Sequence, residues 1–285
     1  MWGQAFLAVP DFIDKTAALG YSGVMLMAKR PHLSVLDYGP AERAALRERI
    51  RAAGLRHVCI AGYNNFTADL EHGEVPHREF QIQHITELAR LASDLGGGLV
   101  RIFTGYENPA AGFSDQWKLV VEAIRECARR AAPLGVVIGV QNHHDLAAGY
   151  EAMRDLIEAI GEPNCRALFD AWAPALQGAD LAEAARTLGP YTVHTTVADY
   201  QLKPRYKYNA ALVNYEPQRP FVQAVPMGEG FIDYGKFFAA LEAGGFRGTV
   251  AYEMCSPLRG GGSIENLDAC ARHFVDYMSG LGAAA

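Results

Sequence analysis

The sequence predicts a single-domain (β/α)8 barrel over residues 1–285, on two observations. First, a glycine is followed by a short apolar run at five places, which read Gly20-YSGVMLM, Gly54-LRHVCIA, Gly96-GGLVRIF, Gly135-VVIGVQ and Gly245-FRGTVAYE. Glycine just past a helix adopts the left-handed conformation that other residues resist, and such a short run is typical of a strand buried on both faces. Second, helix-length amphipathic segments separate the runs. This repetition indicates a parallel sheet covered by helices.

Eight strands and eight helices alternate along the chain, which is the number that closes a barrel of this length. The strands are expected at residues 4–8, 23–27, 56–61, 99–103, 136–141, 167–170, 191–195 and 249–253. The helices are expected at residues 11–19, 40–53, 77–95, 114–133, 149–160, 181–188, 234–243 and 263–278. The first strand has the weakest pattern, because Gly3 and Gln4 are indifferent strand formers. An open doubly wound sheet is the alternative, but no G-x-G-x-x-G motif follows an early strand.

Composition limits the classes of partner. The formal net charge is −6 and no dense basic patch occurs, which argues against nucleic acid and anionic membranes. Five cysteines are odd in number, scattered and without a C-x-x-C pair, as expected for reduced thiols in a cytoplasmic protein. No apolar run is long enough to span a membrane, and the N-terminus lacks a signal-peptide pattern. We therefore expect a cytoplasmic protein that binds neither nucleic acid nor membrane.

Polar side chains stand at the ends of the last four strands that are predicted to form the barrel. They are Gln141, Asp170, His194 and Glu253. In parallel α/β folds, function gathers at these C-terminal edges. Two carboxylates, an imidazole and an amide oxygen suit a divalent ion such as Mn²⁺, Mg²⁺, Co²⁺ or Zn²⁺. The four residues together therefore predict a metal site at the mouth of the barrel.

These motifs resemble those of the xylose isomerase-like TIM barrels, also called the sugar phosphate isomerase/epimerase superfamily. The resemblance runs from ALGYSGV to SIENL, and the F-D, V-H and final Glu motifs match at Asp170, His194 and Glu253. It implies a metal-dependent enzyme, with Mn²⁺ as the preferred ion, that acts on a sugar or cyclitol. Gln141 departs from the family, which usually has Glu there. An amide can ligate a metal but cannot act as a base, so a symmetrical mechanism with two glutamates does not follow.

The chemistry that such a site supports is removal of a proton next to a carbonyl group. His143 shares the strand parity of Gln141 and is the favoured base, with His144 as the alternative and Glu253 as a further proton carrier. Reprotonation of the enolate gives an isomerase or epimerase. Loss of a β-substituent would instead give a lyase that cleaves 3-keto C- or O-glycosides, with a small accessory subunit as a possible partner. A non-catalytic sugar-binding barrel is the third hypothesis, since Gln141 replaces a carboxylate.

Other polar residues on the loops are candidates for substrate contacts. They are Lys29, Arg30, His32, Asn64, Trp172, Lys203 and Arg205. The last two belong to the longest segment outside the predicted elements, residues 199–231, which holds four prolines and four tyrosines. Long loops in compact domains are usually functional or disordered, and the aromatic content argues against disorder. We expect a lid or a subunit contact, and with it a homo-oligomer.

Overall fold

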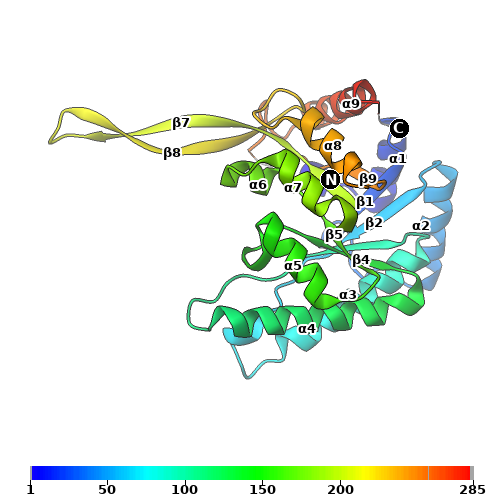
Figure 1. Cartoon of the computed structure of the whole chain (residues 1–285). Helices are drawn as coiled ribbons and strands as arrows, with labels where there is room; N and C mark the ends of the chain where they lie inside the picture. Colours follow the sequence, from blue (N-terminus) through cyan, green and yellow to red (C-terminus); the bar gives the residue numbers. More distant parts are fainter. Residues whose placement is uncertain (1, 256, 283–285) are drawn as a thin grey trace.

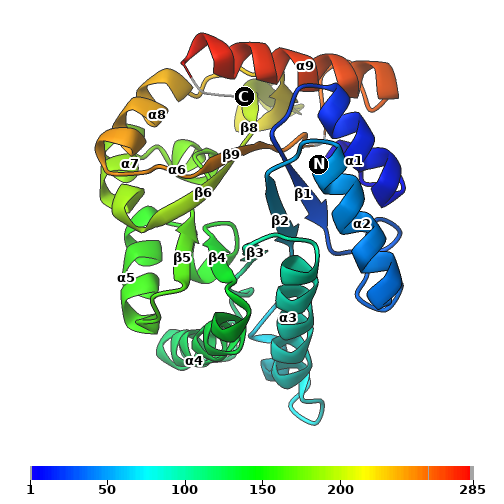
Figure 2. The ribbon, with the colours of Figure 1, turned by 90° about the vertical axis from the view of Figure 1, so that its right-hand side faces the viewer.

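In a computed structural model, which describes residues 2–255 and 257–282, seven parallel strands form a nearly closed TIM barrel. They follow one another around the barrel in the order of the sequence, as Figure 2 shows when the barrel is seen end on. The strands are β1 (Gly23–Met27), β2 (His57–Ala61), β3 (Leu99–Ile102), β4 (Val137–Gln141), β5 (Cys165–Leu168), β6 (Thr192–Val197) and β9 (Thr249–Tyr252). The parallel barrel that the glycine-strand repeat predicts is confirmed.

Helices surround the barrel and bury its outer face (Figure 2). They are α1 (Val9–Ala18), α2 (Pro40–Ala52), α3 (His77–Asp94), α4 (Phe113–Ala131), α5 (Tyr150–Ile160), α6 (Trp172–Gln177), α7 (Leu181–Leu188), α8 (Tyr234–Ala243) and α9 (Ile264–Gly280). All but α6 lie where the sequence predicts a helix, within a few residues. No helix in the described part of the chain combines the length and apolarity that a membrane span requires.

The prediction of a first strand at residues 4–8 is wrong. Trp2–Gln4 form a 3₁₀ turn, and helix α1 already begins at Val9. The turn is tied to α9 instead of the sheet, because the side chain of Gln4 donates to Asp268 at 2.8 Å. No pairing between β1 and β9 is found in the described residues, so an open seam separates these two strands.

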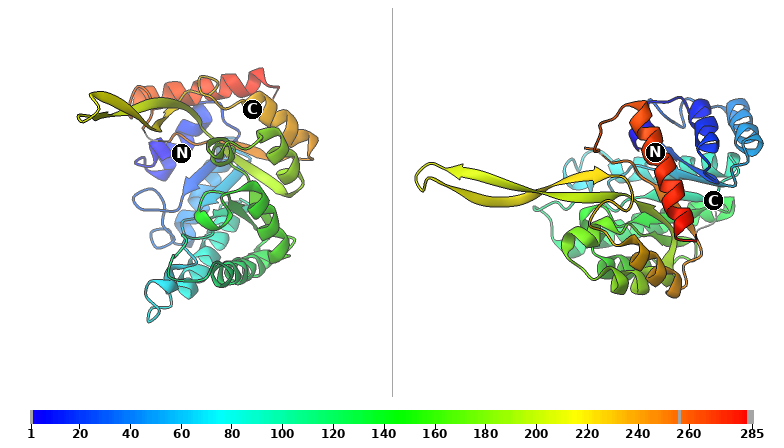
Figure 3. Two further views of the ribbon diagram at one scale, coloured as in Figure 1. Left: turned by 60° about the vertical axis from the view of Figure 1, so that its left-hand side comes forward. Right: turned by 90° about the horizontal axis from the view of Figure 1, so that it is seen from above.

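The long segment after β6 is a two-stranded antiparallel arm. Strand β7 (Asp199–Asn209) pairs with β8 (Asn214–Val225), and Figures 1 and 3 show the ribbon extending far beyond the barrel. Its base is buried at Asp199, Tyr200, Ala224 and Val225, whereas most of its length is exposed. In this structure the arm therefore projects away from the barrel and does not cover the mouth.

Candidate active site

The mouth of the barrel gathers side chains from β4, β5, β6 and β9. Gln141 is the last residue of β4, and its amide nitrogen donates to Asp170 Oδ2 at 3.2 Å and to Thr196 Oγ1 at 2.9 Å. Glu253 follows β9, where its N–H continues the pairing by donating to Val197 O at 2.9 Å. The structure thus brings Gln141 and Asp170 into contact, as predicted, and adds Thr196.

His194 lies deeper in the barrel than the sequence interpretation expects. Strand β6 continues to Val197, and its Thr196 is the residue that contacts Gln141. His194 comes two residues earlier on the same strand, which places it about 6–7 Å deeper in the barrel than Thr196. Its Nδ1 contacts Thr249 Oγ1 at 2.6 Å, at the beginning of β9. The structure does not bring His194 to Gln141 and Asp170.

The donor set at the mouth does not fit the four-ligand metal site that the sequence predicts. Hydroxyl and amide groups, from Thr196 and Gln141, stand beside Asp170, and the amide presents its N–H to the carboxylate instead of its oxygen to an ion. The described residues contain no group of three or more His, Cys, Asp or Glu side chains that could hold a metal ion. We therefore derive no reaction step through a metal.

The carboxyl group of Asp170 is held in an unusual electrostatic state. Burial, and then the nearby Glu253, raise its pKa to about 8. Hydrogen bonds from the Trp172 N–H and from Gln141 oppose this shift but do not cancel it. Asp170 is therefore largely uncharged near neutral pH when no cation is bound beside it.

Two asparagines clamp the strand ends in the same way. Asn142 donates to Asp170 O at 2.9 Å and accepts from Asp170 N at 2.7 Å. Asn64 makes the same pair of bonds with the backbone of Phe103, at 2.7 and 2.9 Å. Both are buried. Asn64, predicted to contact substrate, therefore has both ends of its amide engaged in holding the mouth together.

The two histidines after β4 have different surroundings. His144 lies between Phe103 and Tyr106, whose tilted rings have their centres 4.1 and 4.4 Å away, and burial lowers the pKa of His144 to about 4. His143 stands at the mouth, with its ring centre 5.2 Å from that of Phe103, and keeps an exposed side. Partial burial lowers the pKa of His143, while Glu253 acts to raise it. A neutral imidazole at the mouth can accept a proton.

The remaining predicted contacts divide into two groups. Trp172 lies at the mouth, with its ring centre 6.3 Å from His143 and 5.0 Å from Tyr200, and Lys29 Nζ is 5.8 Å from the ring centre of Tyr63. The others are engaged elsewhere or point to solvent. Arg30 pairs with Asp37 at the surface, buried His32 contacts Leu7 O through Nδ1 at 3.0 Å, and Lys203 and Arg205 are exposed on the arm.

Arg101 is a functional candidate that the sequence interpretation missed. It lies within β3 and is only 1% exposed. Its guanidinium carbon is 4.1 Å from the ring centre of Phe103 and 4.9 Å from that of Tyr63. The available signal was a cation within an apolar run, GGLVRIF, since arginine is almost never fully buried without a reason.

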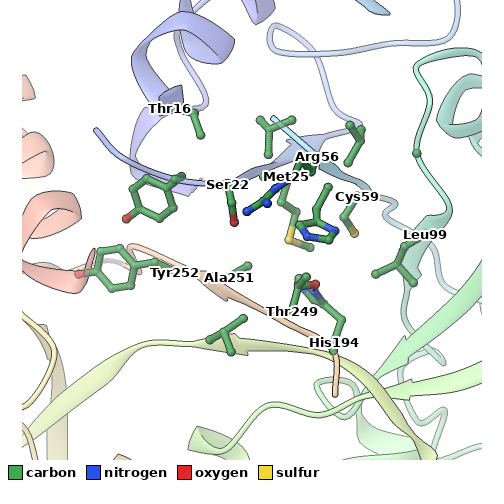
Figure 4. Close-up of a pocket in the computed structure, with 18 of the residues that line it drawn as sticks. Thr16, Ser22, Met25, Arg56, Cys59, Leu99, His194, Thr249, Ala251 and Tyr252 are labelled. Carbon is green, nitrogen blue, oxygen red and sulfur yellow. The ribbon is translucent and has the colours of Figure 1, made fainter. Parts of the chain in front are cut away.

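A cavity in the structure lies away from this mouth. It has a volume of about 660 Å³ and follows the seam between β1 and β9, where the missing first strand was expected. Figure 4 shows Met25, Cys59, Thr249, Ala251 and His194 around it. None of the polar groups of the mouth, Gln141, Asp170, Glu253 or His143, lines this cavity. We regard the seam as a feature of architecture and the mouth as the candidate active site.

Comparison with known proteins agrees with this architecture. Residues 13–273 match the family model of the xylose isomerase-like TIM barrel, and the chain belongs to that family. A curated relative, 2-epi-5-epi-valiolone 7-phosphate 2-epimerase of Actinoplanes sp., is 28% identical over 179 residues, which span 63% of each chain.

Solved structures share the fold at low sequence identity. A D-psicose 3-epimerase from Clostridium cellulolyticum H10 has a TM-score of 0.76 at 16% identity, covering 98% of this chain and 97% of its own. The probable 3-DHS dehydratase of Bacillus anthracis has a TM-score of 0.72 at 15% identity, covering 98% and 96%.

Proposed function

We propose that this protein is an isomerase or epimerase that moves a proton next to the carbonyl group of a keto-sugar or cyclitol. Family membership and the epimerase relative support the reaction class. The observation that carries the proposal is that two proton-carrying side chains stand at the mouth, His143 exposed after β4 and Glu253 after β9. They follow β4 and β9, which are separated in the sheet by β5 and β6, so the two groups approach a substrate from different sides.

The reaction follows from these two groups. His143, neutral at physiological pH, accepts the proton from the carbon next to the carbonyl. The electron pair of the broken C–H bond forms a C=C bond, and the carbonyl π pair moves to oxygen to give an enolate. Return of a proton to the other face of the same carbon gives the epimer. Return to the former carbonyl carbon gives the isomer when the hydroxyl proton of the deprotonated carbon passes to the former carbonyl oxygen, so that the new C=O bond forms at the deprotonated carbon. Glu253 is the second proton carrier, and Trp172 provides an apolar wall.

Hydrogen exchange tests this proposal directly. Incubated with a keto-hexose in D₂O, the wild-type protein should introduce deuterium next to the carbonyl, as measured by NMR. His143→Ala should slow exchange about 100-fold or more, because a positioned general base contributes about 10²–10⁴-fold. His144→Ala is the matched control and should have a smaller effect, since the ring of His144 is enclosed between two aromatic side chains. Unchanged exchange in His143→Ala would reject the base assignment.

A lyase acting on 3-keto glycosides is the second candidate. The dehydratase fold neighbour and the loss of one carboxylate at Gln141 favour it, because elimination needs one strong base instead of two. Release of the aglycone from a 3-keto glucoside would identify this activity, whereas deuterium uptake without cleavage identifies the epimerase. Sugar binding with neither reaction would indicate the non-catalytic barrel.

The arm supports the proposal of a homo-oligomer. Residues 201–223 hold four basic residues and one acidic residue, which leaves 22 basic and 31 acidic residues in the rest of the chain. Apolar side chains on the arm, such as Tyr206, Leu212 and Tyr215, are more than 60% exposed. A cationic, partly apolar arm is complementary to the acidic body of a second copy. Sedimentation velocity should therefore detect a smaller species when the arm is shortened to its buried base.

A further inference from the structure

A buried cation, Arg101, lies beneath the mouth of the barrel. Arg101 is fully buried, yet its Nε and Nη1 atoms have no hydrogen-bond partner among the described residues. Burying a guanidinium is costly unless it is paired, and buried arginines normally are. The chain thus keeps N–H donors and a positive charge in a position where they reduce stability.

The guanidinium lies against two aromatic side chains that follow the C-terminal ends of β2 and β3, the ends that face the mouth. It stacks against Phe103 and Tyr63. Arg101 on β3 pairs with Ala61 on β2, and the two aromatic residues follow this pair by two positions on their respective chain segments, Phe103 after Arg101 and Tyr63 after Ala61. The aromatic faces offset part of the cost of burial through cation–π attraction but accept no in-plane hydrogen bond. The charge acts on the mouth, because Arg101 lowers the pKa values of both His143 and Asp170.

No carboxylate of the mouth is bonded to this cation. Asp170, the acid that Arg101 affects, directs its two oxygens to the Trp172 N–H and to Gln141. The described residues form no salt bridge with Arg101. The described residues thus leave Nε and Nη1 of Arg101 free to bond an anionic oxygen of a bound ligand.

We propose that Arg101 binds the oxygen that becomes negatively charged in the reaction, the enolate oxygen of an α-hydroxy ketone. The inference rests on the proposed function and deepens it. Preorganised donors aimed at a developing charge are worth most in a dry site, where solvent does not compete with them. The donor set at the mouth does not fit a metal ion. In this barrel Arg101 therefore supplies the positive charge.

Two substitutions separate charge from shape. Arg101→Met removes the cation and keeps an unbranched side chain, and Arg101→Lys restores a positive charge. Arg101→Met should lower the rate of deuterium exchange about 10²–10³-fold, with a much smaller change in KM for the ketose, because the charge matters only once the enolate forms. Arg101→Lys should recover part of the rate. Arg101→Met should also melt at a higher temperature than the wild type, since it removes an unpaired buried charge.

Binding of an enolate mimic provides a readout independent of turnover. Erythronohydroxamate, titrated in EDTA by calorimetry, should bind the wild type and lose at least tenfold in affinity with Arg101→Met. If the wild type exchanges no proton but binds the mimic through Arg101, the anion site stands and the proposed reaction fails. If EDTA abolishes exchange and Mn²⁺ restores it, or if Arg101→Met exchanges at the wild-type rate, the role assigned to Arg101 is wrong.

Discussion

The mouth of the barrel and its open seam are held together by different kinds of contact. At the mouth, polar groups are buried and fixed by hydrogen bonds, as in the contacts among Gln141, Asp170 and Thr196. Along the seam, small and flexible apolar residues such as Met25, Cys59 and Ala251 surround a cavity of about 660 Å³. The difference teaches that hydrogen bonds fix the positions of the side chains at the mouth, whereas the non-directional apolar contacts along the seam leave room for a cavity.

The largest effect should come from breaking the asparagine clamp. Asn142→Ala leaves the buried N–H and C=O of Asp170 without partners, and each unsatisfied group costs about 1–3 kcal/mol, so a loss of about 2–6 kcal/mol is expected. Urea unfolding measures this change. Asn64→Ala removes the same pair of bonds at Phe103 and should cost a similar amount. A loss below about 0.5 kcal/mol in both variants would mean that directional bonds do not hold the mouth.

The dependence of stability on pH should distinguish the two regions, because each contains a buried titratable group, Asp170 at the mouth and His194 in the seam. The pKa of Asp170 is raised from 3.8 to about 8, by burial and then by Glu253, against the smaller opposing effect of Arg101. The folded state then holds a proton that the unfolded state releases, so Asp170 makes the free energy of unfolding fall as pH rises from about 4 to 8. Asp170→Asn should remove this part of the decline.

His194 in the seam should act in the opposite direction, between about pH 4 and 6.5. Burial, and then Arg101 and His57, lower its pKa from 6.5 to about 4. Its contribution to stability is present above pH 6.5 and lost as pH falls toward 4. Chemical denaturation from pH 4 to 9 measures the sum of the two opposing slopes between pH 4 and 6.5, and of these two groups only Asp170 contributes between pH 6.5 and 8. Equal slopes in the wild type and in Asp170→Asn would contradict the assignment for the mouth.

The smallest effect should come from filling the seam. Ala251 lines the cavity, so Ala251→Leu can add apolar volume without displacing a hydrogen bond. We expect a gain of about 0.5–2 kcal/mol, the usual range for cavity-filling substitutions, and unchanged exchange activity. Thermal melting measures it. If the variant is instead less stable by 1 kcal/mol or more, the seam is already occupied by protein atoms in solution.

Local patterns determined most of the architecture. Glycine caps, buried runs and amphipathic periodicity located the helices α7 and α8 and the strand β1 at the bounds that the structure has. The same patterns brought Gln141, Asp170 and Glu253 to strand ends. These features are encoded locally because burial and capping depend on residues a few positions apart.

Depth and pairing were decided only by the tertiary structure. His194 and Thr196 share one parity on β6, so sequence cannot tell which of them reaches the mouth. That depends on how far the strand continues against β9. In the sequence Asn64 is typical of a turn, and only the structure places it beside the backbone of Phe103, which follows the next strand. The burial of Arg101 without hydrogen-bond partners for Nε and Nη1, and the attachment of the turn at Gln4 to α9, both depend on residues distant in the chain. Such features cannot be predicted from local patterns, because contacts between strands and helices set them.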